Sequence, residues 1–167
     1  MTLDDGASLL PFFQWLQDTP LADTIRHSAS LIAVLEIIHL IGLTLLIGTI
    51  VMVDLSLLGL GIGRHPVSRI ARELSSWTVA GLAIMLVSGP VLLSSRAVRY
   101  YSTPAFWIKM NLLAAALIVH FTIHRKTTYA DPPVPRRRAG WIAILSLALW
   151  ISVALAGKGI AIFQPPT

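Results

Sequence analysis

A few ionisable side chains interrupt long apolar runs, and these are the residues whose types are suited to chemistry. Glu36 and His39 lie within the run 31–53, and Asp54 follows it directly. At about 100° per residue, Glu36 and His39 are about 60° apart on a helix. Asp54 comes 18 positions after Glu36, about five whole turns, and so returns to the same face. One helical stripe therefore carries an acid near each end, with a histidine beside the first acid.

Later apolar runs carry further ionisable residues. Lys109, His120 and His124 fall on one helical face of the third run, and Lys158 lies between two glycines of the fourth. If these runs cross a membrane, Asp54 and one of the two histidines, His120 or His124, can meet in the half nearer the inner surface.

The other polar positions share a depth near the outer surface and form a candidate cluster: Glu36, His39, Lys109 and Lys158. An ionisable residue at the centre of a membrane helix costs about 2.5–3.5 kcal/mol unless it finds a partner. In a structural interpretation, Glu36 pairs with one of the lysines and fixes the register of the helices. In a functional interpretation, Glu36 and His39 line a polar pocket for a small ligand or ion. The residue types leave both interpretations open.

The histidines also raise the hypothesis of haem b or copper binding. His39 and His120 on separate helices are candidate axial ligands, as in haem-binding helical bundles. Their depths differ by roughly 10 Å, which disfavours a single haem between them. Met110, near the depth of His39, and His124 are further candidate ligands. The chain has no Cys, which excludes thiolate metal sites and covalent haem attachment.

Catalytic motifs are missing from the sequence. It contains no phosphate-binding loop, no His-Glu-x-x-His zinc motif and no nucleophile elbow, so we assign no catalytic residue. We therefore favour a non-enzymatic membrane protein or accessory subunit over an enzyme. Its expected partners are the lipid bilayer and other membrane subunits or a second copy of itself.

The elements that must position these residues are membrane-spanning helices. Of 167 residues, 55% are hydrophobic and only 13% charged, against about 25% charged in soluble domains. With a mean hydropathy of +0.74, this composition excludes a soluble, disordered or nucleic-acid-binding protein despite a pI near 10.2. Four runs reach the roughly 20 residues needed to cross a bilayer. We predict an all-α integral membrane protein, a four-transmembrane-helix bundle with spans at about 31–53, 74–93, 105–124 and 140–163.

The N-terminal segment 1–29 differs from the membrane domain 30–167. It combines a short apolar and aromatic stretch, including Phe12, Phe13 and Trp15, with acidic residues. Such a stretch is typical of an amphipathic helix that lies along the membrane interface. We expect it to lie on the outer surface.

Basic residues in the connections predict the orientation of the chain. They concentrate in the first and third loops: Arg64, Arg69, Arg72, Arg125, Lys126, Arg136, Arg137 and Arg138. The second loop carries only Arg96 and Arg99. Because cytoplasmic loops are enriched in Lys and Arg, both termini are expected outside, in the periplasm of a bacterial inner-membrane protein.

Several short motifs carry a resemblance to known proteins. They are Glu36-x-x-His39-x-x-Gly42, Asp54 with Leu57-Leu58-Gly59, Ser88-Gly89-Pro90, Pro104-x-Phe106-Trp107-x-Lys109 and Gly157-Lys158-Gly159-Ile160. This series resembles small four-span bacterial inner-membrane proteins of uncharacterised function and is distantly similar to CopD-like copper-resistance proteins. The first resemblance matches the polar positions without assigning them roles. The second implies copper or proton handling, although the chain lacks a Met-rich or His-rich metal-loading segment.

Overall fold

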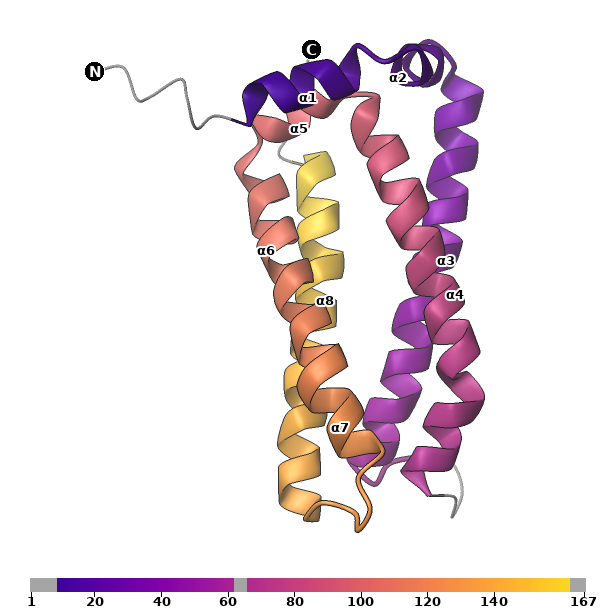
Figure 1. The fold of residues 1–167 in the computed structure, drawn as a ribbon, viewed down its shortest axis with the longest axis vertical. Coiled ribbons are helices and arrows are strands. Elements are labelled where there is room, and N and C mark those ends of the chain that lie inside the picture. Colours follow the sequence, from indigo (N-terminus) through magenta and orange to yellow (C-terminus); the bar gives the residue numbers. More distant parts are fainter. Residues whose placement is uncertain (1–8, 62–65, 163–167) are drawn as a thin grey trace, which may run out of the picture.

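Four long helices dominate the computed structural model, which describes residues 9–61 and 66–162, with side chains as far as residue 159. Of the described residues 86% are helical and none is in a strand. The long helices are α3 (Ala29–Leu57), α4 (Val67–Ser94), the continuous segment α6 (Pro104–Val119), η1 (His120–His124) and α7 (Arg125–Thr128), and α8 (Arg136–Ile162) (Figure 1). Each is long and apolar enough to cross a membrane, as the sequence predicted.

Helix α4 begins earlier than the predicted span, at Val67 instead of residue 74. The added turns are held by an ion pair across one helical turn, with Arg69 Nε 3.1 Å from Glu73 Oε1. Polar turns of this kind extend a helix beyond its apolar stretch, because backbone hydrogen bonding does not depend on hydropathy. Pro90 lies inside α4 and does not end it.

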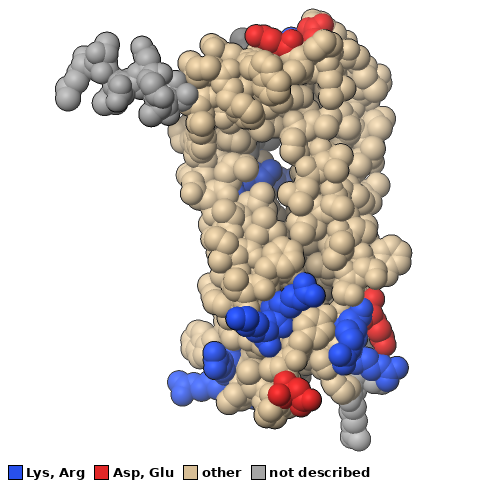
Figure 2. Space-filling model, in the orientation of Figure 1, with Lys and Arg blue, Asp and Glu red and all other residues tan. Residues whose placement is uncertain are grey.

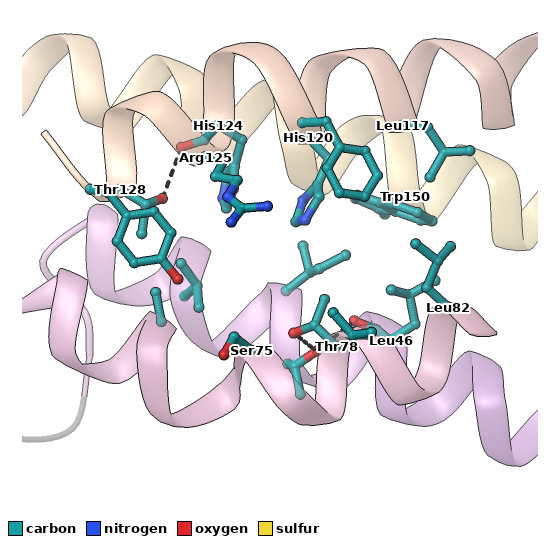
Figure 3. A pocket seen from close by; sticks show the side chains of 17 residues that line it. Leu46, Ser75, Thr78, Leu82, Leu117, His120, His124, Arg125, Thr128 and Trp150 are labelled. Atoms are coloured by element: carbon teal, nitrogen blue, oxygen red, sulfur yellow. Dashed lines mark hydrogen bonds between the residues drawn. The ribbon is translucent and has the colours of Figure 1, made fainter. Parts of the chain in front are cut away.

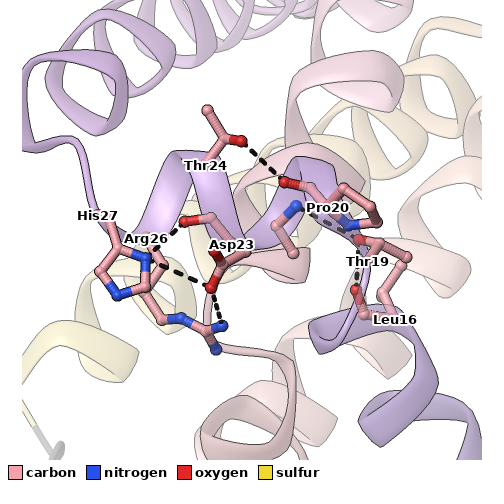
Figure 4. Close-up of polar contacts among 8 residues, drawn as sticks. Leu16, Thr19, Pro20, Asp23, Thr24, Arg26 and His27 are labelled. Carbon is pink, nitrogen blue, oxygen red and sulfur yellow. Dashed lines mark hydrogen bonds and ion pairs between the residues drawn. The ribbon is translucent and has the colours of Figure 1, made fainter.

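The predicted interfacial segment forms two short helices, α1 (Leu10–Gln17) and α2 (Pro20–Arg26), at one end of the molecule (Figure 1). Thr19 caps α2 by accepting a hydrogen bond from the Ala22 amide at 3.3 Å (Figure 4). The Arg26 guanidinium, 2.9 Å from Asp23, holds the pKa of that carboxyl below its usual range. Trp15 is 64% exposed, in a position suited to contact with a lipid interface.

Aromatic packing joins α1 to the start of α6. The ring of Phe13 contacts Tyr101 of α5 (Ala97–Tyr101) and both Phe106 and Trp107 of α6, with centroids 5.1–6.2 Å apart. The Val98 amide donates to Gln17 Oε1 at 3.0 Å. We call this end of the molecule, formed by α1, α2 and α5, the N-terminal end.

The opposite end is basic. Figure 2 shows Lys and Arg side chains gathered there together with some Asp or Glu side chains, and further Asp or Glu side chains at the N-terminal end. The described residues of this basic end include Arg69, Arg72, Arg125, Lys126, Arg136, Arg137 and Arg138. Arg64, which the sequence analysis placed with them, lies outside the described residues.

Packing among the long helices is concentrated between mid-length and the basic end. Helix α3 packs along α4, α6 along α8, and α3 against α8. Two clusters of buried side chains fill these contacts: Leu46, Ile50, Ala116, Trp150 and Val153, and then Val53, Leu57, Ala71, Ala139 and Ala143. The core of the molecule therefore lies beside Asp54, on the same stretch of α3.

Two glycines bring α3 and α4 together at mid-length. A Cβ at Gly81 would lie 2.7 Å from the backbone nitrogen of Leu46, and a Cβ at Gly42 would lie 2.6 Å from Ile84 Cγ2. Small residues allow this close backbone approach between membrane helices. This tight contact separates the polar side chains nearer the two ends of α3.

Candidate functional site

A buried carboxylate and imidazole form the centre of the site. Asp54, in the last turns of α3, is fully buried, and His124, at the end of η1, is 3% exposed. His124 Nε2 and Asp54 Oδ1 are hydrogen-bonded at 2.6 Å, and the imidazole is the donor when the carboxylate is ionised. Charge-assisted hydrogen bonds offset part of the cost of burying ionisable groups. The pair joins α3 to the third long helix, as the sequence stripe indicated for Asp54 and one of two histidines.

A π-helical turn places a second histidine beside this pair. The five residues His120–His124 form η1, and π turns inside α-helices occur frequently at functional sites. The two imidazoles stack, with centroids 5.1 Å apart and planes 19° apart. The other side of the His120 ring meets Trp150 edge-on at 6.3 Å. Helical periodicity in the sequence gave no signal for this turn, although a tryptophan in mid-span was an unusual feature.

Two polar atoms of this group have no hydrogen-bond partner among the described residues. They are Asp54 Oδ2 and His120 Nδ1, and both are buried. A buried polar group without a partner is costly, and such exceptions in folded proteins call for an explanation such as a ligand or ion. The contact between Asp54 and His124 therefore leaves two buried polar atoms of this group unsatisfied.

A cavity of about 250 Å³ lies next to the histidines. Its walls are α4 on one side and α6, η1 and α7 on the other, with α3 and Trp150 at its base (Figure 3). The lining residues that carry polar groups are Thr49, Ser75, Thr78, His120, His124, Arg125, Thr128 and Tyr129. This volume is below the roughly 300–1,000 Å³ of sites for drug-sized ligands, so it suits a small molecule or one end of a larger one.

His39 lies in a separate polar contact in the N-terminal half. Its Nδ1 is 2.7 Å from Ser88 Oγ of α4, and Ser88 Oγ donates to the Ile84 carbonyl at 2.6 Å. A hydroxyl has one proton, so the imidazole Nδ1 donates to Ser88 and its Nε2 carries the lone pair when the ring is neutral. The sequence analysis did not identify Ser88 as this partner, although Ser88-Gly89-Pro90 was among the motifs noted.

The other predicted members of the outer cluster do not form ion pairs. Glu36 and Lys158 are exposed, and Lys109 is half-buried against Gly157, where a Cβ would lie 3.6 Å from its Nζ. In residues 9–61 and 66–159, no ion pair within 4.0 Å involves any of the three. The structural interpretation, in which Glu36 pairs with a lysine, is therefore not realised, because His39 and Gly42 occupy the packed side of α3 and leave Glu36 on the open side.

The structure gives no support to haem or copper binding. His39 contacts α4, whereas His120 stacks on His124 and Trp150, so the two imidazoles share no neighbours. Met110 is 41% exposed. Across the part of the chain that the structure describes, no group of three or more His, Cys, Asp or Glu side chains is placed to hold a metal ion.

Comparisons with known proteins gave one match. A search of curated proteins and a search of solved structures each found nothing similar. A model of a family of unknown function, DUF6644, matches residues 12–163. This match includes all four long helices and every residue of the site.

Proposed function

The chain belongs to DUF6644, a family of unknown function, and we propose that it is a membrane protein that binds a small molecule in the cavity beside Asp54 and His124. In this proposal the protein is non-enzymatic, a binding protein or an accessory subunit of a membrane assembly. The cavity supplies the space, and the buried histidines supply the polar recognition.

The placement in the membrane is part of the proposal. The four long helices form a bundle across a bacterial inner membrane, and α1 and α2 lie along the outer interface as a segment distinct from the membrane domain. The concentration of Lys and Arg at the basic end supports a cytoplasmic position for that end. Both termini then face the periplasm, and the cavity lies in the inner half of the bilayer.

One observation carries the proposal, namely that His120 lines the cavity and that its buried Nδ1 has no hydrogen-bond partner among the described residues. Asp54 and His124 alone would suffice to hold α3 against η1. The imidazole of His120 stacks on His124, and this packing leaves its own Nδ1 without a partner among the described residues. A ligand in the cavity would give that nitrogen a partner and offset the cost of burying it.

A pair of tryptophan substitutions on α4 tests for an occupant. Val79 lines the cavity and is 64% exposed, whereas Val87 lies on the same helix outside the cavity and is 68% exposed. Native mass spectrometry of protein released from lipid nanodiscs should show a bound small molecule in the wild type and in Val87→Trp. The Val79→Trp variant should lose it, since the indole narrows the entrance. Equal occupancy in all three proteins would contradict the proposal.

The same preparations test the alternatives. A haem Soret band in the optical spectrum would favour electron transfer over small-molecule binding. Copper in stoichiometric amount would favour CopD-like metal handling. A change of proton uptake on His39→Ala with unchanged expression would favour proton handling in the N-terminal half. A colourless, metal-free protein with a bound organic molecule supports the proposal.

A further inference from the structure

The charge of the cavity selects among ligands. Its lining contains no Asp or Glu, and its ionisable members are His120, His124, Arg125 and Tyr129. The carboxylate of Asp54 is hydrogen-bonded to His124 and is not among the lining groups. Arg125 forms no ion pair with any residue in the described ranges. Arg125 is therefore the lining residue with a permanent charge, and its guanidinium attracts an anionic group.

The hydrogen-bonding groups of the cavity also favour an anionic ligand. The hydroxyl proton of Thr78 is shared between Thr49 Oγ1 at 2.9 Å and the Leu74 carbonyl at 3.0 Å. Thr49, Ser75 and Thr128 likewise donate to backbone carbonyls, at 2.8–3.0 Å. These hydroxyls can only accept from a ligand.

The donors that remain are the guanidinium of Arg125, the phenol of Tyr129 and the indole N–H of Trp150, for which no hydrogen bond is formed within the described chain. The imidazole of His120 joins them when its free nitrogen is protonated. An arginine presents paired N–H groups that match the oxygens of a carboxylate or phosphate. The cavity therefore offers its strongest donors to an anionic oxygen group.

The two ends of the cavity suit chemically different parts of a ligand. Figure 3 shows Arg125 and Thr128 toward one end of the cavity and Leu82 and Leu117 toward the other. The polar end is the one nearer the basic end of the molecule. The total volume of about 250 Å³ is small, so the apolar end suits one short hydrocarbon chain better than two.

Access to the cavity is from the side of the molecule. Val79 of α4 and Phe121 of η1 line the cavity from facing walls, and they are 64% and 48% exposed. Helix α4 packs on α3, and α6 packs on α8, so the seam between α4 and α6 is the less closed one. In a bilayer this seam faces lipid, and a ligand dissolved in the membrane reaches it without crossing water.

From charge, donors, shape and access, we propose that the ligand is a single-chain amphiphile with an anionic oxygen headgroup, taken from the leaflet at the basic end. The headgroup, a carboxylate or phosphate, binds Arg125 and Tyr129, and the chain lies between Leu82, Leu117 and Trp150. This inference rests on the proposed function, because it names the class of molecule for the same cavity.

Trp150 makes the proposal measurable, since it lines the cavity and bromine quenches indole fluorescence on contact. The probes are an ω-bromo fatty acid of medium chain length, the corresponding ω-bromo alkyl phosphate and the methyl ester of the acid. The Trp150→Phe variant gives the background from the other tryptophans, and the difference signal reports the cavity. The acid, the phosphate or both should quench Trp150 saturably, and the ester should bind at least about tenfold more weakly, because it loses the charge-assisted hydrogen bonds.

Two neighbouring residues provide a matched comparison. Both Arg125 and Lys126 are exposed, but only Arg125 is among the residues that line the cavity. Arg125→Gln should weaken binding of the anionic probe by about tenfold or more, and Lys126→Gln should leave it nearly unchanged. Equal losses of affinity in the two variants would mean that the probe responds only to the overall surface charge, and this result would overturn the inference.

The remaining outcomes separate this inference from the proposed function. Equal quenching by the acid and the ester would overturn the anionic headgroup while the cavity remains a binding site. No saturable quenching of Trp150 by any probe, together with no bound molecule in nanodisc-released protein, would overturn both. A retained two-chain phospholipid in the mass spectra, with no competition by the single-chain acid or phosphate, would overturn the single-chain class alone.

Discussion

The two polar regions along α3 differ in how completely the fold encloses them. In the N-terminal half, His39 is half-buried and makes a hydrogen bond to Ser88, and Glu36 is exposed. In the basic half, Asp54 and His124 are both buried and joined at 2.6 Å. The same helical stripe thus leads to an open contact at one end and an enclosed pair at the other.

The difference follows from which helices α3 meets along its length. Toward the basic end it contacts both α4 and α8, and the large side chains of the core surround it. Toward the N-terminal end its packed side faces α4. Enclosure by neighbours on several sides removes water and lipid headgroups, which raises the cost of leaving a charge unpaired. Position relative to the core therefore decides how strongly a polar residue constrains the structure.

The glycine contact keeps the two regions apart. Gly42 and Gly81 bring the helix backbones together between His39 and Asp54, so no continuous polar path follows the α3–α4 seam. Each region is therefore accessible from its own end or side of the molecule. In the proposed binding mode, a ligand reaches the histidines of η1 through the α4–α6 seam, and the glycine contact lies between that ligand and Ser88.

The largest effect is expected in the enclosed pair. His124→Ala should lower the free energy of unfolding by about 3–5 kcal/mol, since it leaves the Asp54 carboxylate buried without its partner. The measurement is detergent-induced unfolding followed by circular dichroism. The double variant Asp54→Leu with His124→Leu should recover most of the loss, because it removes both charges together. A cost for His124→Ala no larger than that of His39→Ala would erase the distinction between the two regions.

An intermediate effect is expected at the glycine contact that separates the regions. Gly81→Ala should destabilise the protein by about 1–3 kcal/mol, because the new methyl group meets backbone atoms of α3. Gly48→Ala is the matched control on α3, since nothing lies within 4 Å of a Cβ there. That control should be neutral or stabilising by up to about 1 kcal/mol. Similar costs for the two variants in the same unfolding assay would show that the close contact is absent in the membrane.

The smallest effect is expected in the open region. A double-mutant cycle of His39→Ala and Ser88→Ala should give a coupling of about 0.6 kcal/mol, typical of hydrogen bonds between membrane helices. The hydrogen bond is between neutral groups and is half-exposed, so its loss leaves no buried charge. A coupling free energy as large as that between Asp54 and His124 would show that the two regions do not differ in how strongly their polar contacts stabilise the protein.

Much of the fold was predictable because the information is local. Runs of apolar residues of sufficient length predicted the four helices that are long enough to cross a membrane. The short helices α1 and α2 matched the aromatic segment before the first span. Membership in an uncharacterised family is confirmed by the match to residues 12–163, whereas the likeness to CopD stays a prediction.

The candidate site was predictable only in part. Helical periodicity placed Asp54 and two histidines on facing stripes, which was enough to expect a contact between them. It also grouped Glu36 with Lys109 and Lys158, and that grouping produced no ion pair in the described chain. Two residues at the same depth in the membrane do not necessarily touch, because their helices must also be adjacent and rotated so that the two side chains face each other.

By itself, the sequence determined which residues form helices, how many of these helices can span a bilayer, and which end of the molecule is basic. These properties depend on neighbours in the chain and on solvation of each segment. Only the tertiary structure decided that His124 rather than His120 pairs with Asp54, and that a cavity opens beside them. That choice depends on the rotation of the third helix about its axis, which the π turn and the packing of Ala116 and Trp150 set together.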